Sequence, residues 1–256
     1  MDEKKNIYTN RQVLKINYLK GSKLRRTPIT IQGIKSQAFF TSWSWNILGF
    51  YFLFSGILTL YIDNELSTNK SSNSSNTYYD ELSNDKHMKI AFRIALILFE
   101  IAAPVSMLVS VVVRYALWPK ALKGNGSDNL KKITILIQHN ANVIMSLIEV
   151  GLLGGLKVRF ADMALAPLFG VIYVVFAWSM KHNWLKNGQP QFLYFFLDTT
   201  LGKGTSVALL VLLFLLTVFY ATFALIDDII ATLGGSFWVH LGVVIGIASV
   251  TCRFKD

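Results

Sequence analysis

Polar and ionisable residues lie inside an apolar stretch of the chain, residues 133–153. Four of them, His139, Asn142, Ser146 and Glu149, follow steps of three, four and three, so on a helix they share one face. An ionisable group inside hydrocarbon costs roughly 2.5–3.5 kcal/mol, so it is kept mainly where it pairs or works. We therefore expect this face to look into a protein interior or a wet cavity, while lipid covers the other side.

A hydroxyl group lies at a similar depth in an earlier apolar stretch. Thr41 is about three residues into residues 38–62, ~5 Å deep, and His139 is about six residues into its own stretch, ~9 Å deep. Both stretches are expected to cross the membrane in the same direction, so the two side chains lie in one leaflet and can meet. A histidine beside a hydroxyl takes its proton during attack on a carbonyl and returns it to the leaving alcohol. The pair predicts nucleophilic acyl transfer.

Other polar residues are candidates for roles around this pair. Asn142 or Glu149 would orient the imidazole ring or bind a developing oxyanion, although Glu149 lies ~15 Å along the helix from His139, too far for direct contact. The predicted cavity-lining or supporting residues are Ser42, Asn142, Ser146, Glu149 and Glu100. A purely structural alternative stays open, in which Thr41 bonds to a neighbouring backbone and His139 joins two helices.

Arg93 and Glu100 are seven residues apart in a second apolar stretch and share a helix face. They predict either a structural ion pair or a polar cluster with residues 133–153. A third interpretation makes Glu100, His139 and Glu149 a proton relay.

Composition excludes several classes of protein. The chain has 256 residues, 53% of them hydrophobic, and a mean hydropathy of +0.44, which points to a membrane protein. Its net charge of +10 comes from residues clustered between apolar segments, so we predict no nucleic-acid partner. The single cysteine, Cys252, forms no internal disulfide, and the four histidines lack partners at zinc-ligand spacing. No metal site and no cofactor are predicted.

The hydropathy pattern predicts an all-α, polytopic transmembrane helix bundle with about six spans. They are expected at residues 38–62, 90–118, 133–153, 163–180, 205–226 and 229–251, because each approaches the ~20 residues that cross a bilayer as helix. We divide the chain into a basic cytosolic N-terminal segment, 1–37, and one transmembrane domain, 38–252.

Charge places both termini in the cytosol. Nineteen of the 25 Lys and Arg residues fall on the side of the termini and five on the other, which is the positive-inside pattern. Residues 63–89 then form a flexible luminal loop rich in Ser and Asn. Asn69 and Asn73 in this loop fit the N-glycosylation pattern.

Several segments resemble the androgen-induced intramembrane threonine hydrolase family. The run from Phe39 to Trp43, followed by the aromatic residues 50–52, resembles the first block of that family. Residues 103–105 and 115–120 resemble the next block, and His139 with Glu149 ten residues later resembles its histidine helix. Residues 173–178 and 192–198 look like its later aromatic segment. The resemblance implies hydrolysis of fatty acid esters of hydroxy fatty acids, with Thr41 as nucleophile and His139 as base.

The same two runs, 41–43 and 139–142, are also similar to the rolling stone family, whose members are associated with membrane fusion. The sequence is thus compatible with three functions: a threonine-dependent lipid ester hydrolase, a non-enzymatic membrane interaction or fusion protein, and a small proton-coupled transporter. The expected partners are membrane lipids and a lipid ester substrate. The expected location is the endomembrane system or the plasma membrane.

Overall fold

The computed structural model describes residues 12–14, 29–31, 33–69, 85–122, 132–153, 157–183, 192–233 and 236–253. Their regular structure is helical apart from two short strands, β1 (Gln12–Leu14) and β2 (Ile29–Ile31), which pair antiparallel. This strand pair lies in the N-terminal segment, for which the sequence indicated only a basic composition. The short helix η1 (Gly33–Ala38) leads from it into the bundle.

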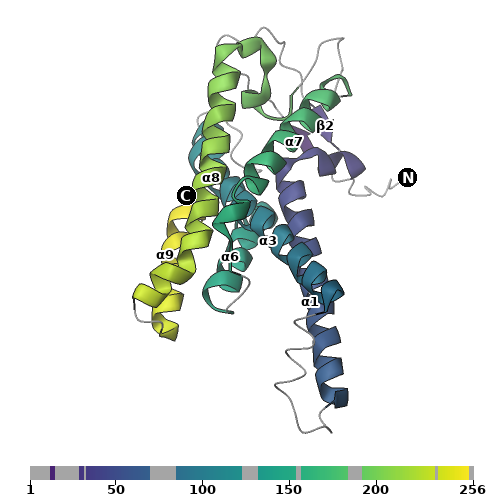
Figure 1. The fold of residues 1–256 in the computed structure, drawn as a ribbon. Coiled ribbons are helices and arrows are strands. Elements are labelled where there is room, and N and C mark those ends of the chain that lie inside the picture. Colours follow the sequence, from purple (N-terminus) through teal and green to yellow (C-terminus); the bar gives the residue numbers. More distant parts are fainter. Residues whose placement is uncertain are drawn as a thin grey trace, which may run out of the picture.

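Six helices make up the bundle shown in Figure 1: α1 (Phe40–Asn69), α3 (Lys86–Val112), α6 (Ile133–Gly151), α7 (Leu165–Ser179), α8 (Lys203–Thr232) and α9 (Phe237–Thr251). Short helical segments extend or join them: η2 (Val113–Leu117), α4 (Trp118–Leu122), η3 (Phe160–Asp162), η4 (Met180–His182), η5 (Phe195–Leu197) and η6 (Thr199–Leu201). Of these, η2 is a π-helix that continues α3 without a break.

In the part of the chain that the structure describes, five helical segments are long and apolar enough to cross a membrane. They are Phe40–Glu65, Lys86–Leu117, Ile133–Gly151, Phe160–His182 and Lys203–Ile226. The expected helical membrane fold is therefore confirmed at this level. The sixth apolar helix, α9, has 15 residues and spans ~22 Å, less than the ~30 Å of a bilayer core.

Two predicted boundaries differ from the structure. The sixth span was expected from residue 229, but α8 continues to Thr232 and α9 begins at Phe237. Asp227 and Asp228 do not stop a helix that is already formed, whereas Ser236 caps the next one by accepting from the Val239 N–H. The expected loop 63–89 is also shorter, since α1 runs to Asn69 and α3 starts at Lys86. Asn73 lies outside the described residues.

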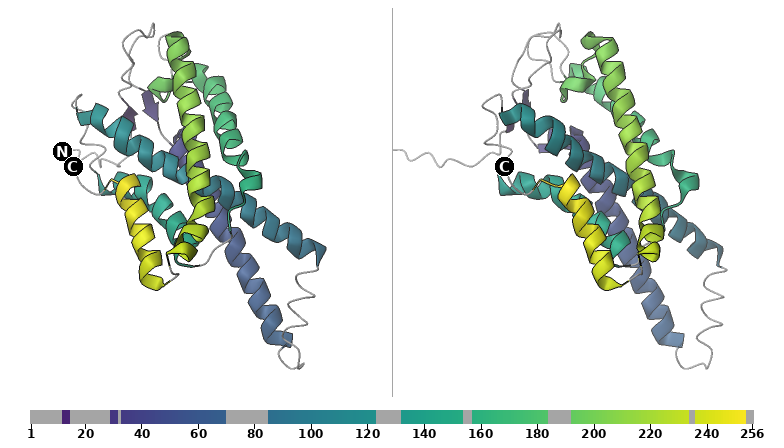
Figure 2. Two further views of the ribbon diagram at one scale, coloured as in Figure 1. Left: turned by 60° about the vertical axis from the view of Figure 1, so that its left-hand side comes forward. Right: turned by 90° about the vertical axis from the view of Figure 1, so that its left-hand side faces the viewer.

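Helix α3 is the centre of the bundle. It packs against α1, α6, α7 and α8, and it also contacts α9. The buried residues Phe99, Ala102, Ala103 and Met107 lie along it, and their small and large side chains let neighbouring helices approach closely. Asp85 starts this helix by accepting from the His87 N–H at 3.0 Å. The two views in Figure 2 show α3 crossing between the other helices.

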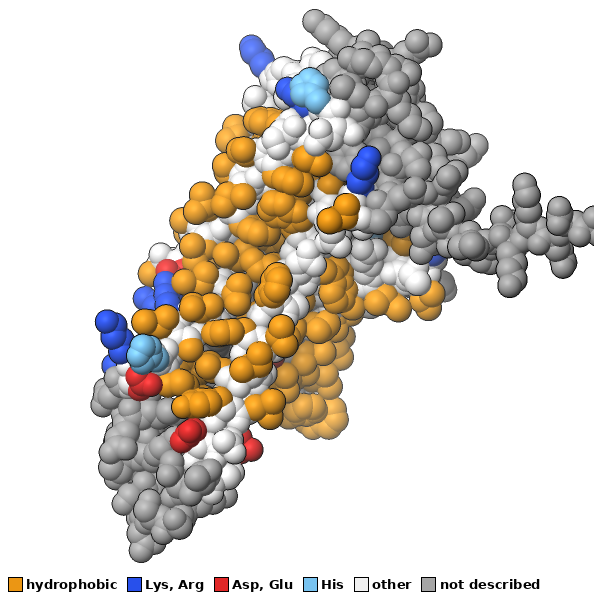
Figure 3. Space-filling model, turned by 90° about the vertical axis from the view of Figure 1, so that its right-hand side faces the viewer, with side chains coloured by type: hydrophobic (Ala, Val, Ile, Leu, Met, Phe, Trp, Pro, Cys, Tyr) orange, Lys and Arg blue, Asp and Glu red, His pale blue; other side chains and the backbone are white. Residues whose placement is uncertain are grey.

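The start of α1 and the end of α9 lie at the same end of the bundle, beside the start of α6. Trp45 of α1 donates to the Gln138 carbonyl, and Asn140 donates to the carbonyl of Arg253 just beyond α9. These two hydrogen bonds hold α1, α6 and the end of α9 together. Hydrophobic side chains cover the middle of the face in Figure 3, while charged side chains gather towards its two ends.

Candidate active site

The first turn of α1 lies between an apolar cavity and an open, more polar cleft. Thr41 is 8% exposed and lines an apolar cavity of about 250 Å³, whereas Ser42 lines an open cleft of about 360 Å³ between α1 and α6. The wall of this cleft combines the polar side chains of Gln37, Asn46 and Gln138 with Trp45 and Ile137, so it is more polar than the cavity at Thr41. Successive helix residues point about 100° apart, which is why neighbours reach different hollows.

The apolar cavity lies between α1, α3, α7 and α8 and has the lining expected for a hydrocarbon chain. Its wall includes Leu108 and Val112 of α3 and Leu209 and Leu216 of α8. The lining residues Val171 and Val175 of α7 are 43% and 60% exposed on the lipid-facing surface. The cavity wall therefore reaches the apolar outer surface of the bundle at α7.

Two tyrosines surround the polar end of this cavity. The Phe40 N–H donates to the hydroxyl of Tyr194 at 3.2 Å, and that hydroxyl also contacts the side chain of Thr41. Tyr173 donates its hydroxyl to the Ala38 carbonyl at 2.9 Å. Burial raises the pKa of Tyr194 to about 12, so the phenol keeps its proton at neutral pH. The hydroxyl groups of Thr41, Tyr173 and Tyr194 thus lie near one another in the otherwise apolar wall of the cavity.

The seam between α1 and α6 sets Thr41 and His139 at one level. Asn142 donates to Ser44 at 3.0 Å, and Tyr51 donates to Glu149 at 2.6 Å; each pair is separated by 98 residues. Equal offsets mean that the two helices run parallel in a fixed register. Thr41 and His139 are also 98 residues apart, one helix turn before the first of these pairs. This agrees with the depth estimate from the sequence.

The imidazole of His139 is oriented by its own helix. Its Nδ1 lies 2.8 Å from the carbonyl oxygen of Ile135. A carbonyl only accepts, so Nδ1 carries the proton and the neutral ring presents an unprotonated Nε2. In the part of the chain that the structure describes, no hydrogen bond joins Thr41 to His139. The hydroxyl contacts Tyr194 instead, and His139 is not part of the cavity wall.

Three predicted supporting residues hold the helices together. Asn142 and Glu149 join α6 to α1 through the seam bonds, and Ser146 lies 3.2 Å from the hydroxyl of Ser106 on α3. Ser42 donates to the Ser36 carbonyl at 2.9 Å, which fixes the start of α1. None of these four residues lines the apolar cavity. Asn142, Ser146 and Glu149 position the helix that carries His139, whereas Ser42 positions the start of α1.

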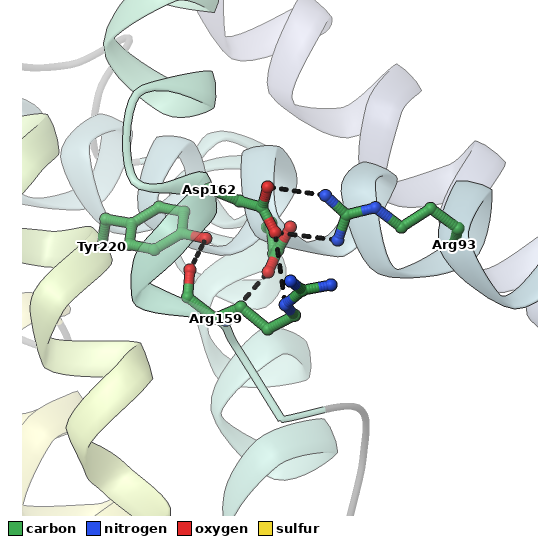
Figure 4. Close-up of polar contacts among 5 residues, drawn as sticks. Arg93, Arg159, Asp162 and Tyr220 are labelled. Atoms are coloured by element: carbon green, nitrogen blue, oxygen red, sulfur yellow. Dashed lines mark hydrogen bonds and ion pairs between the residues drawn. The ribbon is translucent and has the colours of Figure 1, made fainter.

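Glu100 belongs to a separate polar cluster, drawn in Figure 4, where α3 meets the segment before α7. Arg93 pairs with Asp162 through two hydrogen bonds, at 2.6 and 2.8 Å, and not with Glu100 as one interpretation of the sequence suggested. Glu100 is fully buried and accepts a hydrogen bond from the backbone N–H of Arg159 at 2.9 Å. Tyr220 of α8 donates its hydroxyl to the backbone carbonyl of Arg159. The cluster ties α3, α7 and α8 together.

Sequence reasoning missed the two tyrosines. Residues 173–178 and 192–198 were noted only as an aromatic segment, and Tyr194 reaches Phe40 across 154 residues. Helical periodicity cannot predict such a contact, because Tyr194 lies in a non-helical connection just before η5. Among the described residues, no group of three or more His, Cys, Asp or Glu side chains is placed to hold a metal ion.

Comparison of the chain with models of protein families, with curated proteins and with solved structures finds no match.

Gly170 is the residue where a substitution would narrow the cavity most directly. A Cβ atom at this position would lie 2.8 Å from Cδ1 of Leu216, and both residues line the cavity. We expect Gly170→Leu to weaken binding of a fluorescent fatty acid by about tenfold, measured by energy transfer from Trp178 in the same wall. The control is Gly246→Leu on α9, which has open space around it. Equal binding by both variants would contradict acyl-chain binding in this cavity.

Proposed function

We propose that this protein is an intramembrane hydrolase of lipid esters, with Thr41 as nucleophile and His139 as general base. One observation carries the proposal: Thr41 lines the apolar cavity, and the register of α1 on α6 puts it level with His139. The site combines a hydrocarbon-lined cavity at Thr41 with a histidine at the same level on a neighbouring helix. Fatty acid esters of hydroxy fatty acids, the substrates that the family resemblance implies, fit this combination.

The reaction begins when Thr41 rotates about χ1 between staggered positions, which moves its hydroxyl from Tyr194 towards α6. His139 Nε2 takes the hydroxyl proton as Oγ1 bonds to the ester carbonyl carbon, and the carbonyl electron pair moves onto oxygen. When this pair returns, the bond from carbon to the alkoxy oxygen breaks. His139 gives its proton to the departing alcohol, leaving an acyl group on Thr41.

Water completes the cycle. A water molecule attacks the acyl carbon, His139 accepts one of its protons, and the bond to Oγ1 breaks as that proton returns to Thr41. The products are a fatty acid and a hydroxy lipid. The open polar cleft beside Ser42 supplies the water, since it adjoins the same turn of α1 and the start of α6.

Two features support His139 as the base. Its Nδ1 is held by the Ile135 carbonyl, which fixes the tautomer that leaves Nε2 available, as a carboxylate does in a Ser-His-Asp triad. Glu149 bonds to Tyr51 and Glu100 to Arg159, so these carboxylates already have partners elsewhere. This division of roles favours the hydrolase over a proton relay through the three residues. We place the protein in the endomembrane system or plasma membrane, with this site in the cytosolic leaflet.

The test is labelling of the detergent-solubilised protein with a fluorophosphonate probe, followed by peptide mapping. We expect a phosphonyl adduct on Thr41, and we expect prior incubation with a palmitoyl ester of hydroxystearic acid to reduce it. A folded protein that takes no label, or an adduct at another residue, would overturn the proposal. The interaction-protein alternative would then become the better account.

A further inference from the structure

The oxyanion formed at Thr41 needs a hydrogen-bond donor, and Tyr194 is the side chain already in contact with the Thr41 hydroxyl. We infer that Tyr194 is a third catalytic residue, whose phenol donates to the carbonyl oxygen of the ester as negative charge develops there. This inference rests on the hydrolase proposed above and extends it to the stabilisation of the transition state.

The hydrogen bonds around Tyr194 set the direction of its proton. Its oxygen accepts from the Phe40 N–H, and the neighbouring Tyr173 commits its own proton to the Ala38 carbonyl. Among the described residues, no hydrogen bond takes the proton of Tyr194, so this proton is available to an ester oxygen beside Thr41. When Thr41 turns its hydroxyl towards His139, the carbonyl oxygen of the bound ester takes the place of that hydroxyl beside the phenol and accepts its proton.

The surroundings of Tyr194 hold this donor rigidly. Its ring stacks on Phe196, with centroids 5.1 Å apart and an interplanar angle of 9°, and meets Phe39 edge-on at 6.4 Å. Tyr173 lies edge-on at 6.4 Å on another side. A donor fixed by packing costs no reorganisation at the moment of reaction, which is what makes oxyanion stabilisation effective. An apolar wall also strengthens the electrostatic interaction compared with water.

Tyr194 joins the connection before α8 to the start of α1. It belongs to the connection between α7 and α8, and its hydroxyl lies at the first turn of α1. Tyr194 and Thr41 both line the apolar cavity, so an ester held there contacts both residues. Burial keeps the phenol protonated well above neutral pH, as its raised pKa indicates, so the group remains a donor throughout the working range.

The experiment compares hydrolysis of a palmitoyl ester of hydroxystearic acid by wild type, Tyr194→Phe and Tyr115→Phe. Loss of one oxyanion donor typically lowers kcat by about 10²–10³-fold, so we expect a fall of about 10²-fold in Tyr194→Phe, with KM within about threefold of wild type. Tyr115→Phe removes a phenol hydroxyl that donates to the Val250 carbonyl outside the cavity, so it should keep kcat within a few-fold. The rate of fluorophosphonate labelling should fall in parallel with kcat, because the phosphonyl oxygen occupies the same position.

A second variant separates catalysis from folding. Replacement of Tyr194 by 3-fluorotyrosine keeps the ring and hydroxyl but makes the phenol more acidic and a stronger donor, so kcat at neutral pH should rise while KM stays within about threefold of wild type. If Tyr194→Phe does not fold, this comparison alone decides the role of Tyr194. A Tyr194→Phe enzyme with kcat within about threefold of wild type, or a fluorotyrosine enzyme with unchanged kcat, would overturn that role. Activity that survives Thr41→Ala would instead overturn the proposed hydrolase and this inference together.

Discussion

Thr41→Ala is expected to reduce ester hydrolysis by roughly 10³-fold or more, because it removes the nucleophile that carries the acyl intermediate. The neighbouring Ser42→Ala change removes a hydroxyl from the same helix turn but faces the polar cleft, so its kcat should stay within a few-fold of wild type. Turnover would be measured on purified protein in detergent with the same hydroxystearate ester. Equal losses in both variants would indicate damage to the start of α1, and full activity in Thr41→Ala would exclude the mechanism.

His139→Ala should produce a loss of the same size, since an unassisted threonine hydroxyl is a poor nucleophile. Residues that act as one unit have non-additive effects, so the double variant Thr41→Ala, His139→Ala should be no slower than Thr41→Ala alone. His139→Gln serves as the matched polar control, because it preserves a side chain that can bond to the Ile135 carbonyl but lacks a basic nitrogen. Retained activity in His139→Gln would show that the ring holds the helix and takes no proton.

Glu100→Ala is expected to destabilise the protein by roughly 3 kcal/mol or more. The change leaves a buried cavity and removes the acceptor of the Arg159 N–H, and each effect is costly in a packed interior. Glu100→Gln keeps Oε1 for this hydrogen bond. The other oxygen, Oε2, has no hydrogen-bond partner among the described residues, so the amide should cost about 1 kcal/mol or less.

Cys252 provides the measurement. It is the only cysteine in the chain and is 1% exposed, so a thiol-reactive fluorogenic dye reports unfolding on heating in detergent. A clear fall in midpoint for Glu100→Ala, with Glu100→Gln close to wild type, would confirm a structural role. If Glu100→Gln were stable but abolished a pH-dependent solute uptake in proteoliposomes, the transporter would regain support.

The sequence by itself was sufficient to predict the features that depend on a single segment of the chain. Apolar length predicts membrane helices because backbone groups in hydrocarbon must pair within their own segment. A rise of 1.5 Å per residue allowed the depths of Thr41 and His139 to be compared, and the helical register later gave the same level. The shared face of Asn142, Ser146 and Glu149 also followed from spacing, and the structure fills that face with neighbouring helices.

Only the tertiary structure decided which polar groups meet. Arg93 pairs with Asp162, 69 residues away, because the connection before α7 folds against α3. Helical periodicity within one segment cannot predict that contact. Tyr194 reached Thr41 for the same reason, from a connection outside the membrane-length helices. The apolar cavity likewise exists only as the space left between four helices. The spacing of residues along the chain determines which side chains share one face of a helix. Which side chains of other segments contact that face depends on how distant segments pack.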